Sequence, residues 1–248
     1  MTGWTFGNGL IDERNYDLQG QLTEQRLNTG TGSIINRRTY QYDKNSNMLS
    51  RDTTPQNSLY RYNALDRLIH ESQNQLPLND YRYDLYGYRL ETPSASDNET
   101  YRYLENSNRL DHTETLDNSG NILAEKPERE LIYNDAGRLF QLIEDGVPRA
   151  EYRYTDQGLR TRKTLYQADG ITVQSVIVYH YDPIGQLITE TTETRDPIKD
   201  YIRLEGMTPV AQIDYNPSTN RESIRYLYTD HLDTPRLATD RNQAVVWR

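Results

Sequence analysis

The sequence predicts an all-β protein in which antiparallel β-hairpins follow one another as an array and form a curved or spiral sheet. Three observations support this fold class. A short tyrosine-rich phrase returns along the chain, its copies recur at intervals of about twenty residues, and each copy leads into residues that favour a tight turn. A phrase repeated at nearly constant intervals indicates a repeat architecture.

The repeated phrase is a pair of tyrosines two residues apart, or a close variant, followed by Asp, Asn or Thr. Clear copies are "YQYDKNSNML" from Tyr40, "YRYDLYGYRL" from Tyr81 and "YHYDPIGQL" from Tyr179. Residues i and i+2 share one face of a strand, so each pair predicts a strand with tyrosine on one face. The second tyrosines are Tyr42, Tyr62, Tyr83, Tyr103, Tyr133, Tyr154, Tyr181 and Tyr228.

Two further copies are incomplete. Tyr16-Asp17 lacks the first tyrosine, and the copy from Tyr201 has Arg203 in the second position. In the full copies the residue between the tyrosines faces the other way, and it is often arginine, as at Arg61, Arg82, Arg102 and Arg153. We expect these arginines to pair with short acceptors on the same face, such as Asn63 and Asp84.

A type I turn follows each strand. Asp182-Pro183-Ile184-Gly185 places Asp, Pro and Gly at positions where such turns favour them. An alternating stretch such as Leu187 to Thr192 then predicts the return strand of a hairpin. No long stretch has the apolar spacing of a helix, and the densest apolar run, Ile171 to Val178, is β-branched and typical of a strand.

The composition favours a thin-walled or hollow structure. Hydrophobic residues make up only 34% of the chain, and there are 21 tyrosines against 2 phenylalanines and 2 tryptophans. A tyrosine buries its ring but keeps a hydroxyl that needs water or a partner. Sheets that carry tyrosine on one face and Arg, Asp or Thr on the other suit a wall with solvent near both faces.

Composition also argues against several classes of function. Mean hydropathy is −0.95 and no apolar run approaches the roughly 20 residues of a membrane-spanning helix. The N-terminal "MTGWTFGNGL" has no signal-peptide pattern. The chain has no cysteine, which excludes disulfides and thiolate metal sites, and its net charge of −9 argues against binding to nucleic acid.

The phrases resemble the YD repeats of the Rhs family, in which a Tyr-x-Tyr-Asp pair precedes a turn and a leucine. On this resemblance residues 1–200 are a YD-repeat hairpin array, and residues 201–248 are the start of an Rhs-associated core region that continues the same sheet. "YLYTDHLDTPRLATDRNQAVVW" from Tyr226 looks like the opening of that core, although Asp233 stands where the family has Gly.

The family includes Rhs polymorphic toxins, the C components of insecticidal toxin complexes, and teneurins. The resemblance implies a structural shell, or a fragment of one, that encapsulates a C-terminal toxin and is not itself an enzyme. It implies a toxin domain as partner, production in the bacterial cytoplasm, and export or delivery within a larger toxin, with a secretion system among the routes. The chain begins inside repeat sequence and stops before the phrase at which such toxins are cut, so we expect a fragment.

Two other functions stay open. Rows of tyrosine with neighbouring Arg and Asp are also typical of carbohydrate- or receptor-binding surfaces, whereas tyrosines that stack in ladders would join neighbouring hairpins. The chain is also compatible with an autoproteolytic core whose cleavage region is missing; "DPIGQL" at Asp182 matches the cleavage phrase locally but lies where a repeat has its turn. We further expect exposed strand edges to permit self-association or a partner chain.

No residue is predicted to be catalytic, to bind a cofactor or to bind a metal. Asp230, His231 and Asp233 offer three ligand types in close order, but the core-region phrase explains them as a loop. His70, His112 and His180 are scattered, and we expect them on strands or at the surface.

Overall fold

The computed structural model describes residues 2–53, 55–93, 98–100, 115–126, 128–219 and 221–248. Over these residues every regular element is a β-strand, and no helix is present. The predicted all-β hairpin array is therefore confirmed. The chain divides into two compact units, Met1–Asp111 and His112–Arg248, and each is described by itself.

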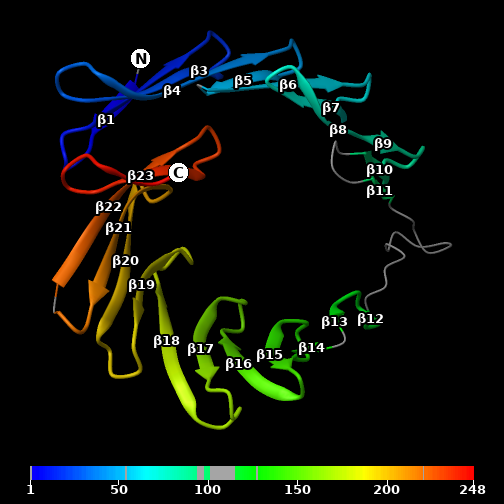
Figure 1. Ribbon diagram of the computed structural model, residues 1–248, viewed down its shortest axis with the longest axis vertical. Helices are drawn as coiled ribbons and strands as arrows, with labels where there is room; N and C mark the ends of the chain where they lie inside the picture. The colour runs from blue at the N-terminus through cyan, green and yellow to red at the C-terminus, as the bar shows by residue number, and fades with distance from the viewer. Residues whose placement is uncertain (1, 54, 94–97, 101–114, 127, 220) are drawn as a thin grey trace. The chain divides into compact units, whose positions relative to one another are not determined.

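The first unit holds an antiparallel sheet of eight strands in sequence order and a smaller sheet of three strands in the order β11-β10-β9 (Figure 1). The strands are β1 Thr2–Thr5, β2 Ile11–Tyr16, β3 Leu22–Asn28, β4 Ile34–Tyr42, β5 Met48–Thr53, β6 Gln56–Tyr62, β7 Leu68–Gln73, β8 Leu76–Asp80, β9 Arg82–Tyr83, β10 Arg89–Pro93 and β11 Asn98–Thr100.

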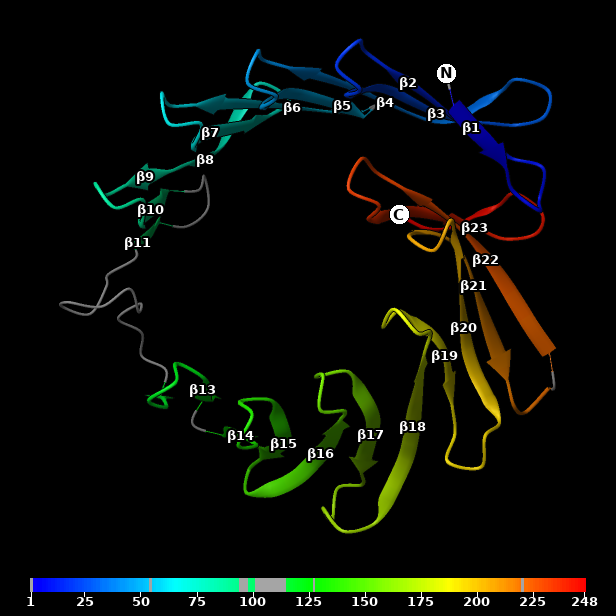
Figure 2. The same cartoon turned by 180° about the vertical axis from the view of Figure 1, so that it is seen from behind.

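The second unit holds one antiparallel sheet of thirteen strands, again in sequence order, and the reverse view in Figure 2 shows its strands following one another. The strands are β12 Thr115–Leu116, β13 Ile122–Lys126, β14 Arg129–Tyr133, β15 Leu139–Glu144, β16 Val147–Tyr154, β17 Arg160–Tyr166, β18 Val173–Tyr181, β19 Leu187–Thr191, β20 Pro197–Leu204, β21 Thr208–Asn216, β22 Arg221–Thr229, β23 Pro235–Thr239 and β24 Val245–Trp247.

Most hairpins close through a five-residue turn of one type. In the turn that begins at Asp182, the amide of Asp182 donates to the carbonyl of Gln186 at 2.9 Å, and the amide of Gly185 donates to the carbonyl of Asp182 at 3.0 Å. Gly185 has φ of 86°, the left-handed conformation that closes a three-residue hairpin loop with a bulge. The turn chemistry predicted from Asp182 and Gly185 is confirmed.

Because successive strands alternate in direction, the turns that follow the tyrosine phrases within each sheet lie at one end of its strands, which we call the YD end of that sheet. We call the first residue of each such turn its cap. The caps are Asp17, Asp43, Asn63, Asp84, Asp117, Asn134, Thr155, Asp182 and Asp230.

The paired tyrosines lie on one sheet face, as predicted. In the first sheet Tyr40 pairs with Arg51 and Tyr60 with Glu71, while the intervening positions, such as Thr39 and Leu59, face the other way. Few apolar side chains of the described residues are fully buried, in keeping with a single layer of strands. They are Phe6, Leu10, Leu22, Leu27, Tyr40, Leu131, Ala150, Ala211, Tyr228, Leu237 and Ala238.

One predicted copy is out of phase. In the copies that end at Tyr62 and Tyr181 the second tyrosine directly precedes the cap, but Thr229 stands between Tyr228 and Asp230. Thr229, not Tyr228, therefore pairs with Pro235, the residue that follows the turn. A shift of one residue moves a side chain to the opposite face, so Tyr228 does not occupy the second-tyrosine position.

The predicted core region lies within the second sheet. Residue 200 falls inside β20, and β20 to β24 continue the strand order of β12 to β19. That residues 201–248 form a region of their own stays a prediction. Among the described residues, no helix is long and apolar enough to cross a membrane.

Candidate functional site: the joint between neighbouring hairpins

The cap residue of each YD-end turn holds the turn together with its side chain. Asp182 Oδ1 accepts from the amides of Ile184 at 3.0 Å and Gln186 at 2.8 Å. The same two bonds form at the other Asp and Asn caps, whereas Thr155 accepts one bond, from Leu159. A short acceptor at this position replaces partners that the turn's amides would otherwise find in water.

This role corrects one prediction from the sequence. Asn63 and Asp84 were expected to pair with arginines on their strand face, but their side chains bond to the amides of their own turns. Arg153 instead bonds to Glu151, two residues earlier on the same strand, at 2.7 Å. Arg102 and Tyr103 lie outside the described residues.

The hydrogen bonds within the turns also lower the pKa of cap carboxylates. The side-chain amide of Asn47, followed by the backbone amides of Asn47 and Asn45, holds the pKa of Asp43 below its ordinary value. Asn121 does the same for the pKa of Asp117. These caps are therefore charged acceptors at neutral pH, the state in which their hydrogen bonds are strongest.

The second tyrosine of a phrase joins its hairpin to the hairpin before it. The hydroxyl of Tyr62 donates to the carbonyl of Met48 at 3.0 Å, and the hydroxyl of Tyr181 donates to the carbonyl of Arg160 at 2.8 Å. Equivalent bonds run from Tyr42 to Leu22, from Tyr83 to Leu68 and from Tyr154 to Leu139, at 2.7 to 3.1 Å. We call this bond the latch and the residue before the cap the latch residue.

Every latch has the same register. Its acceptor is the first residue of the return strand in the preceding hairpin, five positions after that hairpin's cap, as Leu68 follows Asn63 and Arg160 follows Thr155. Each latch residue also pairs across its own hairpin with the residue five positions after its own cap, as Tyr62 pairs with Leu68. One row of positions therefore closes each hairpin and joins it to the next.

The incomplete copy at Tyr201 keeps the latch with a different side chain. Arg203 precedes Leu204, which is not a cap, but it pairs across its hairpin with Pro209 as Tyr62 pairs with Leu68, and its Nη1 donates to the carbonyl of Leu187 at 2.6 Å. Leu187 is five positions after the cap Asp182, so the register is that of the tyrosine latches. Tyr228, which is out of phase, shares a hydrogen bond of 2.8 Å with Thr239 instead.

The tyrosines that form latches are also partly buried. The rings of Tyr42, Tyr62 and Tyr181 are partly buried, and this burial raises the pKa of each hydroxyl above its ordinary value. A neutral hydroxyl is the form that can donate to a carbonyl. The latches are therefore intact at neutral pH.

Arginines make a second link between neighbouring turns in the forward direction. Arg138, four positions after the cap Asn134, donates to the carbonyls of Thr155 at 2.7 Å and Asp156 at 2.9 Å in the next turn. A Cβ on Gly158 would lie 3.0 Å from this guanidinium. Gly158 is thus required by its backbone conformation and by the approach of Arg138.

Two first tyrosines, Tyr81 and Tyr201, and Tyr215 outside the phrase bond to carboxylates of neighbouring strands. Tyr201 donates to Glu190 at 2.6 Å, and burial together with this bond raises the pKa of Tyr201. Tyr215 donates to Asp200 at 2.7 Å, and that bond, more than burial, raises the pKa of Tyr215 to about 12. These side chains are occupied in cross-strand contacts.

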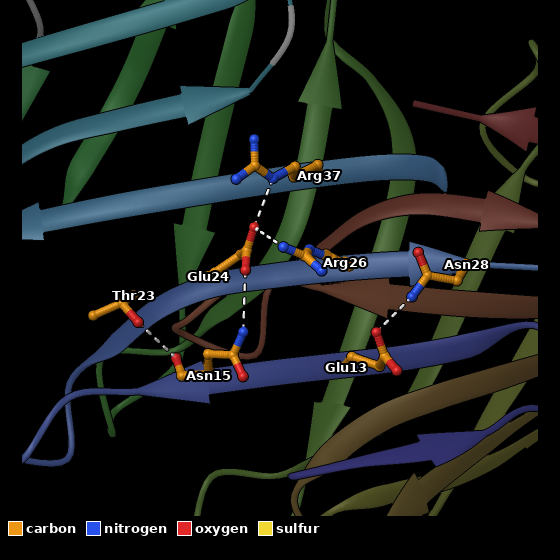
Figure 3. Close-up of polar contacts among 7 residues, drawn as sticks. All are labelled: Glu13, Asn15, Thr23, Glu24, Arg26, Asn28 and Arg37. Carbon is orange, nitrogen blue, oxygen red and sulfur yellow. Dashed lines mark hydrogen bonds and ion pairs between the residues drawn. The ribbon is translucent and has the colours of Figure 1, made fainter. Parts of the chain in front are cut away.

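The opposite face of the first sheet carries a polar cluster (Figure 3). Glu24 accepts from Arg37 at 2.6 Å, from Arg26 at 2.9 Å and from Asn15 at 3.0 Å. Burial raises the pKa of Glu24, but the hydrogen bonds from the three donors together lower it by more. The pKa of Glu24 therefore lies below its ordinary value. The cluster ties together three neighbouring strands, β2, β3 and β4.

A shallow hollow of about 280 Å³ lies beside this cluster, lined by Ile11, Glu13, Arg26, Asn28, Thr29, Gly30, Gly32 and Ile34. Figure 3 shows Asn28 donating to Glu13, a bond of 2.7 Å. A larger hollow of about 540 Å³ in the second unit is lined by Asp196, Pro197, Tyr215, Asn216, Pro217, Arg221 and Glu222. Both are open surface features beside turns at the end of the strands opposite the YD end.

The residues weighed for metal binding have other contacts. Asp230 is the cap of its turn and accepts from Arg236 at 2.7 Å, and Asp233 accepts from Thr208 at 3.1 Å. Among the described residues no group of three His, Cys, Asp or Glu side chains is placed to hold a metal ion. His70 contacts Asp80, His180 contacts Thr191, and His112 lies outside the described residues.

Sequence comparisons identify the repeat. Residues 5–108 match the teneurin YD-shell family. No curated protein sequence matches the chain.

Solved structures share the fold over 98% of this chain. TcdB2-TccC3 superposes with a TM-score of 0.74 at 17% identity, and TcdB2-TccC3-Cdc42 with 0.75 at 16% identity; the chain covers 15% of each of those chains. The Tc holotoxin pore of Photorhabdus luminescens gives 0.74 at 18% identity, with 14% of that chain covered. The chain thus spans about one seventh of the length of the structures it matches.

These matches define the class of protein first: the array of latched hairpins has the fold of a YD shell. Over residues 5–108 the match to the YD-shell family is also one of sequence, and the predicted resemblance of the phrases to YD repeats is confirmed.

Proposed function

We propose that the chain is a structural wall segment of an Rhs-type shell that encloses a toxin cargo, and that it has no catalytic role of its own. The observation that carries the proposal is the uniform joint. Six neighbouring hairpin pairs are joined by a donor at the same position to a carbonyl at the same position. Repetition of one mechanical contact suits a wall, whereas a catalytic site needs a few residues in one place.

The solved structures support this role by their fold, and one of them is the pore of a Tc holotoxin. We infer a toxin domain as the partner of this wall, with the exposed strand edges available for a further chain. Production in the bacterial cytoplasm and delivery as part of a larger toxin follow from the same proposal.

Protease protection tests the enclosure. The complete gene product that contains these residues is treated with a nonspecific protease, and the fate of its C-terminal region is followed by mass spectrometry. We expect that region to survive in the native protein and to be cut once Tyr62, Tyr154 and Tyr181 are changed to Phe. Equal cleavage of both proteins, each folded by circular dichroism, would contradict enclosure.

A binding surface is the second candidate, and one observation favours it. Tyr86 and Tyr88 are 87% and 37% exposed and lie within a turn whose cap, Asp84, holds both of their amides. Their rings are 6.4 Å apart. A glycan array tests this candidate: a signal abolished by Tyr86→Ala at unchanged stability would support a lectin-like role, and no signal would reject it.

Autoproteolysis at the Asp182 phrase is the third candidate. Asp182 Oδ1 is bonded to two amides of its own turn, and Asp182 caps a turn like the others. An intact mass after prolonged incubation of the purified chain would exclude cleavage there, and a time-dependent product ending at Asp182 would establish it.

A further inference from the structure

The latch lies where the backbone ladder between two hairpins has ended. In the joint between β5 and β6 the outermost pair at the YD end is Ser50 with Leu59, and the latch acceptor Met48 lies two residues beyond it. In the joint between β17 and β18 the outermost pair is Arg162 with Val178, and the acceptor Arg160 is again two residues beyond.

The same two-residue gap occurs in five of the six latched joints: the outermost pairs of three others begin at Glu24, Gln141 and Thr189, and their acceptors are Leu22, Leu139 and Leu187. In the sixth joint the amide of Tyr81 donates to the carbonyl of Ile69 at 3.0 Å, so the backbone bonds reach the residue before the acceptor Leu68. Within each hairpin, by contrast, the ladder runs up to the turn, as from Tyr62 and Leu68 onwards. Neighbouring hairpins therefore part at the YD end, and a side chain spans the opening.

The joint between β21 and β22 has the same opening without a tyrosine or arginine latch. Its outermost pair at the YD end is Ala211 with Tyr226, and Pro209, the residue that pairs with Arg203, lies two residues beyond it. Here the side chain of Thr208 donates to Asp233 in the next YD-end turn at 3.1 Å. The opening is therefore a regular feature of the YD end, and different side chains span it.

We propose that the latch position is a bridging position that fixes the opening between neighbouring hairpins, and with it the local bend of the sheet, and that tyrosine and arginine are interchangeable there. A backbone ladder sets strand spacing at about 4.8 Å wherever it runs. Beyond its end the spacing is set by the side chains that span the opening, and the latch is the one that recurs at the same register in six joints. Arg203 shows that a hydrogen-bond donor of sufficient reach is required, because it fills the same register as the tyrosines.

Spin labels test the bridging role directly. The chain has no cysteine, so two cysteines can be introduced as the only labelling sites. Lys44→Cys and Leu65→Cys place labels on the exposed tips of the two YD-end turns that flank the latch of Tyr62. The distance distribution between the labels is measured by electron paramagnetic resonance in the otherwise native chain and with Tyr62→Phe, Tyr62→Arg or Tyr60→Phe. Tyr60 is the first tyrosine of the same strand and serves as the matched control.

We expect Tyr62→Phe to broaden the distribution at least twofold, and Tyr62→Arg and Tyr60→Phe to keep the native width. A native width in Tyr62→Phe would overturn the bridging role even if that variant were less stable. Broadening in Tyr62→Arg would overturn the equivalence of the two side chains. Labels at Gln157→Cys and Ile184→Cys repeat the test at Tyr181 should the first variant fail to fold. The outcome is independent of whether the shell encloses a cargo.

Discussion

The two units use the same repeat with different regularity. In the first unit the latches of Tyr42 on β4, Tyr62 on β6 and Tyr83 on β9 follow one another, and the last reaches from the three-stranded sheet to Leu68 of the eight-stranded sheet. In the thirteen-stranded sheet the latch passes from tyrosine to Arg203, and at the joint between β21 and β22 Thr208 bonds to Asp233 instead. The comparison teaches that the opening between hairpins of this kind can be spanned by different side chains.

The largest expected difference lies between two turn glycines, one in each unit, of which one faces an arginine and the other does not. Gly20 in the first unit and Gly158 in the second both have positive φ, but only Gly158 faces an arginine of the preceding turn. We expect Gly20→Val to cost about 1–2 kcal/mol from its backbone conformation alone. Gly158→Val should cost about 3 kcal/mol, because it also displaces the forward link of Arg138. Urea denaturation measures both, and equal losses would show that the forward link contributes nothing.

The next largest difference in stability is expected between two cap residues. Asp43 in the first sheet holds two backbone amides and the side chain of Asn47, whereas Thr155 in the second holds one amide. We expect Asp43→Ala to lower the free energy of unfolding by about 1–2 kcal/mol and Thr155→Val by about 0.5–1 kcal/mol. Thermal unfolding of the two variants shows which one loses more stability. A larger loss in Thr155→Val than in Asp43→Ala would contradict the role given to the cap.

Alkaline pH should affect the second unit through its tyrosine–carboxylate bonds. Tyr215 has a pKa of about 12 in the fold against an ordinary value of 10.0. A group whose pKa is raised on folding contributes stability that is complete below its unfolded pKa and is lost as pH rises through the folded one. Stability should therefore fall between pH 10 and pH 12, less so in Tyr215→Phe. Identical pH profiles of the two proteins would contradict the bond to Asp200.

The smallest predicted effect is stabilising. Ser46 in the first sheet and Arg195 in the second occupy turn positions with φ of 70°, where most of the equivalent turns have glycine. Ser46→Gly and Arg195→Gly should each raise the free energy of unfolding by about 0.5–1 kcal/mol, because glycine adopts this conformation without strain. A loss of stability in either would mean that its side chain makes a contact worth more than the strain.

The sequence predicted the hairpins, the turns and the sheet face of the tyrosines, because each depends on residues close together in the chain. Asp182 and Gly185 define a turn by local chemistry, and Tyr60 and Tyr62 define a face by strand periodicity. The phase slip at Tyr228 was also visible, since Thr229 separates it from Asp230. The spacing of the tyrosines alone does not reveal the slip, because it takes no account of the cap.

The latch could not be predicted in the same way. Its acceptor is a backbone carbonyl, carried by Leu, Met or Arg with equal effect, so no side chain marks it. Its partner is fixed by the register between hairpins, which local sequence does not define. The one available signal was the excess of 21 tyrosines over 2 phenylalanines, which indicated that hydroxyls were needed without showing where they bond. Ring stacking was expected in their place.

The central claim is that tyrosine hydroxyls, rather than tyrosine rings, join neighbouring hairpins. Its most direct test is the free energy of unfolding of a variant in which Tyr42, Tyr62 and Tyr83 are all Phe. The matched control changes Tyr16, Tyr60 and Tyr86 to Phe, three hydroxyls with no hydrogen bond among the described residues. We predict that the latch variant loses about 3 kcal/mol, about one for each bond, and that the control changes by less than about 1 kcal/mol. Equal stability of the two variants would contradict the account.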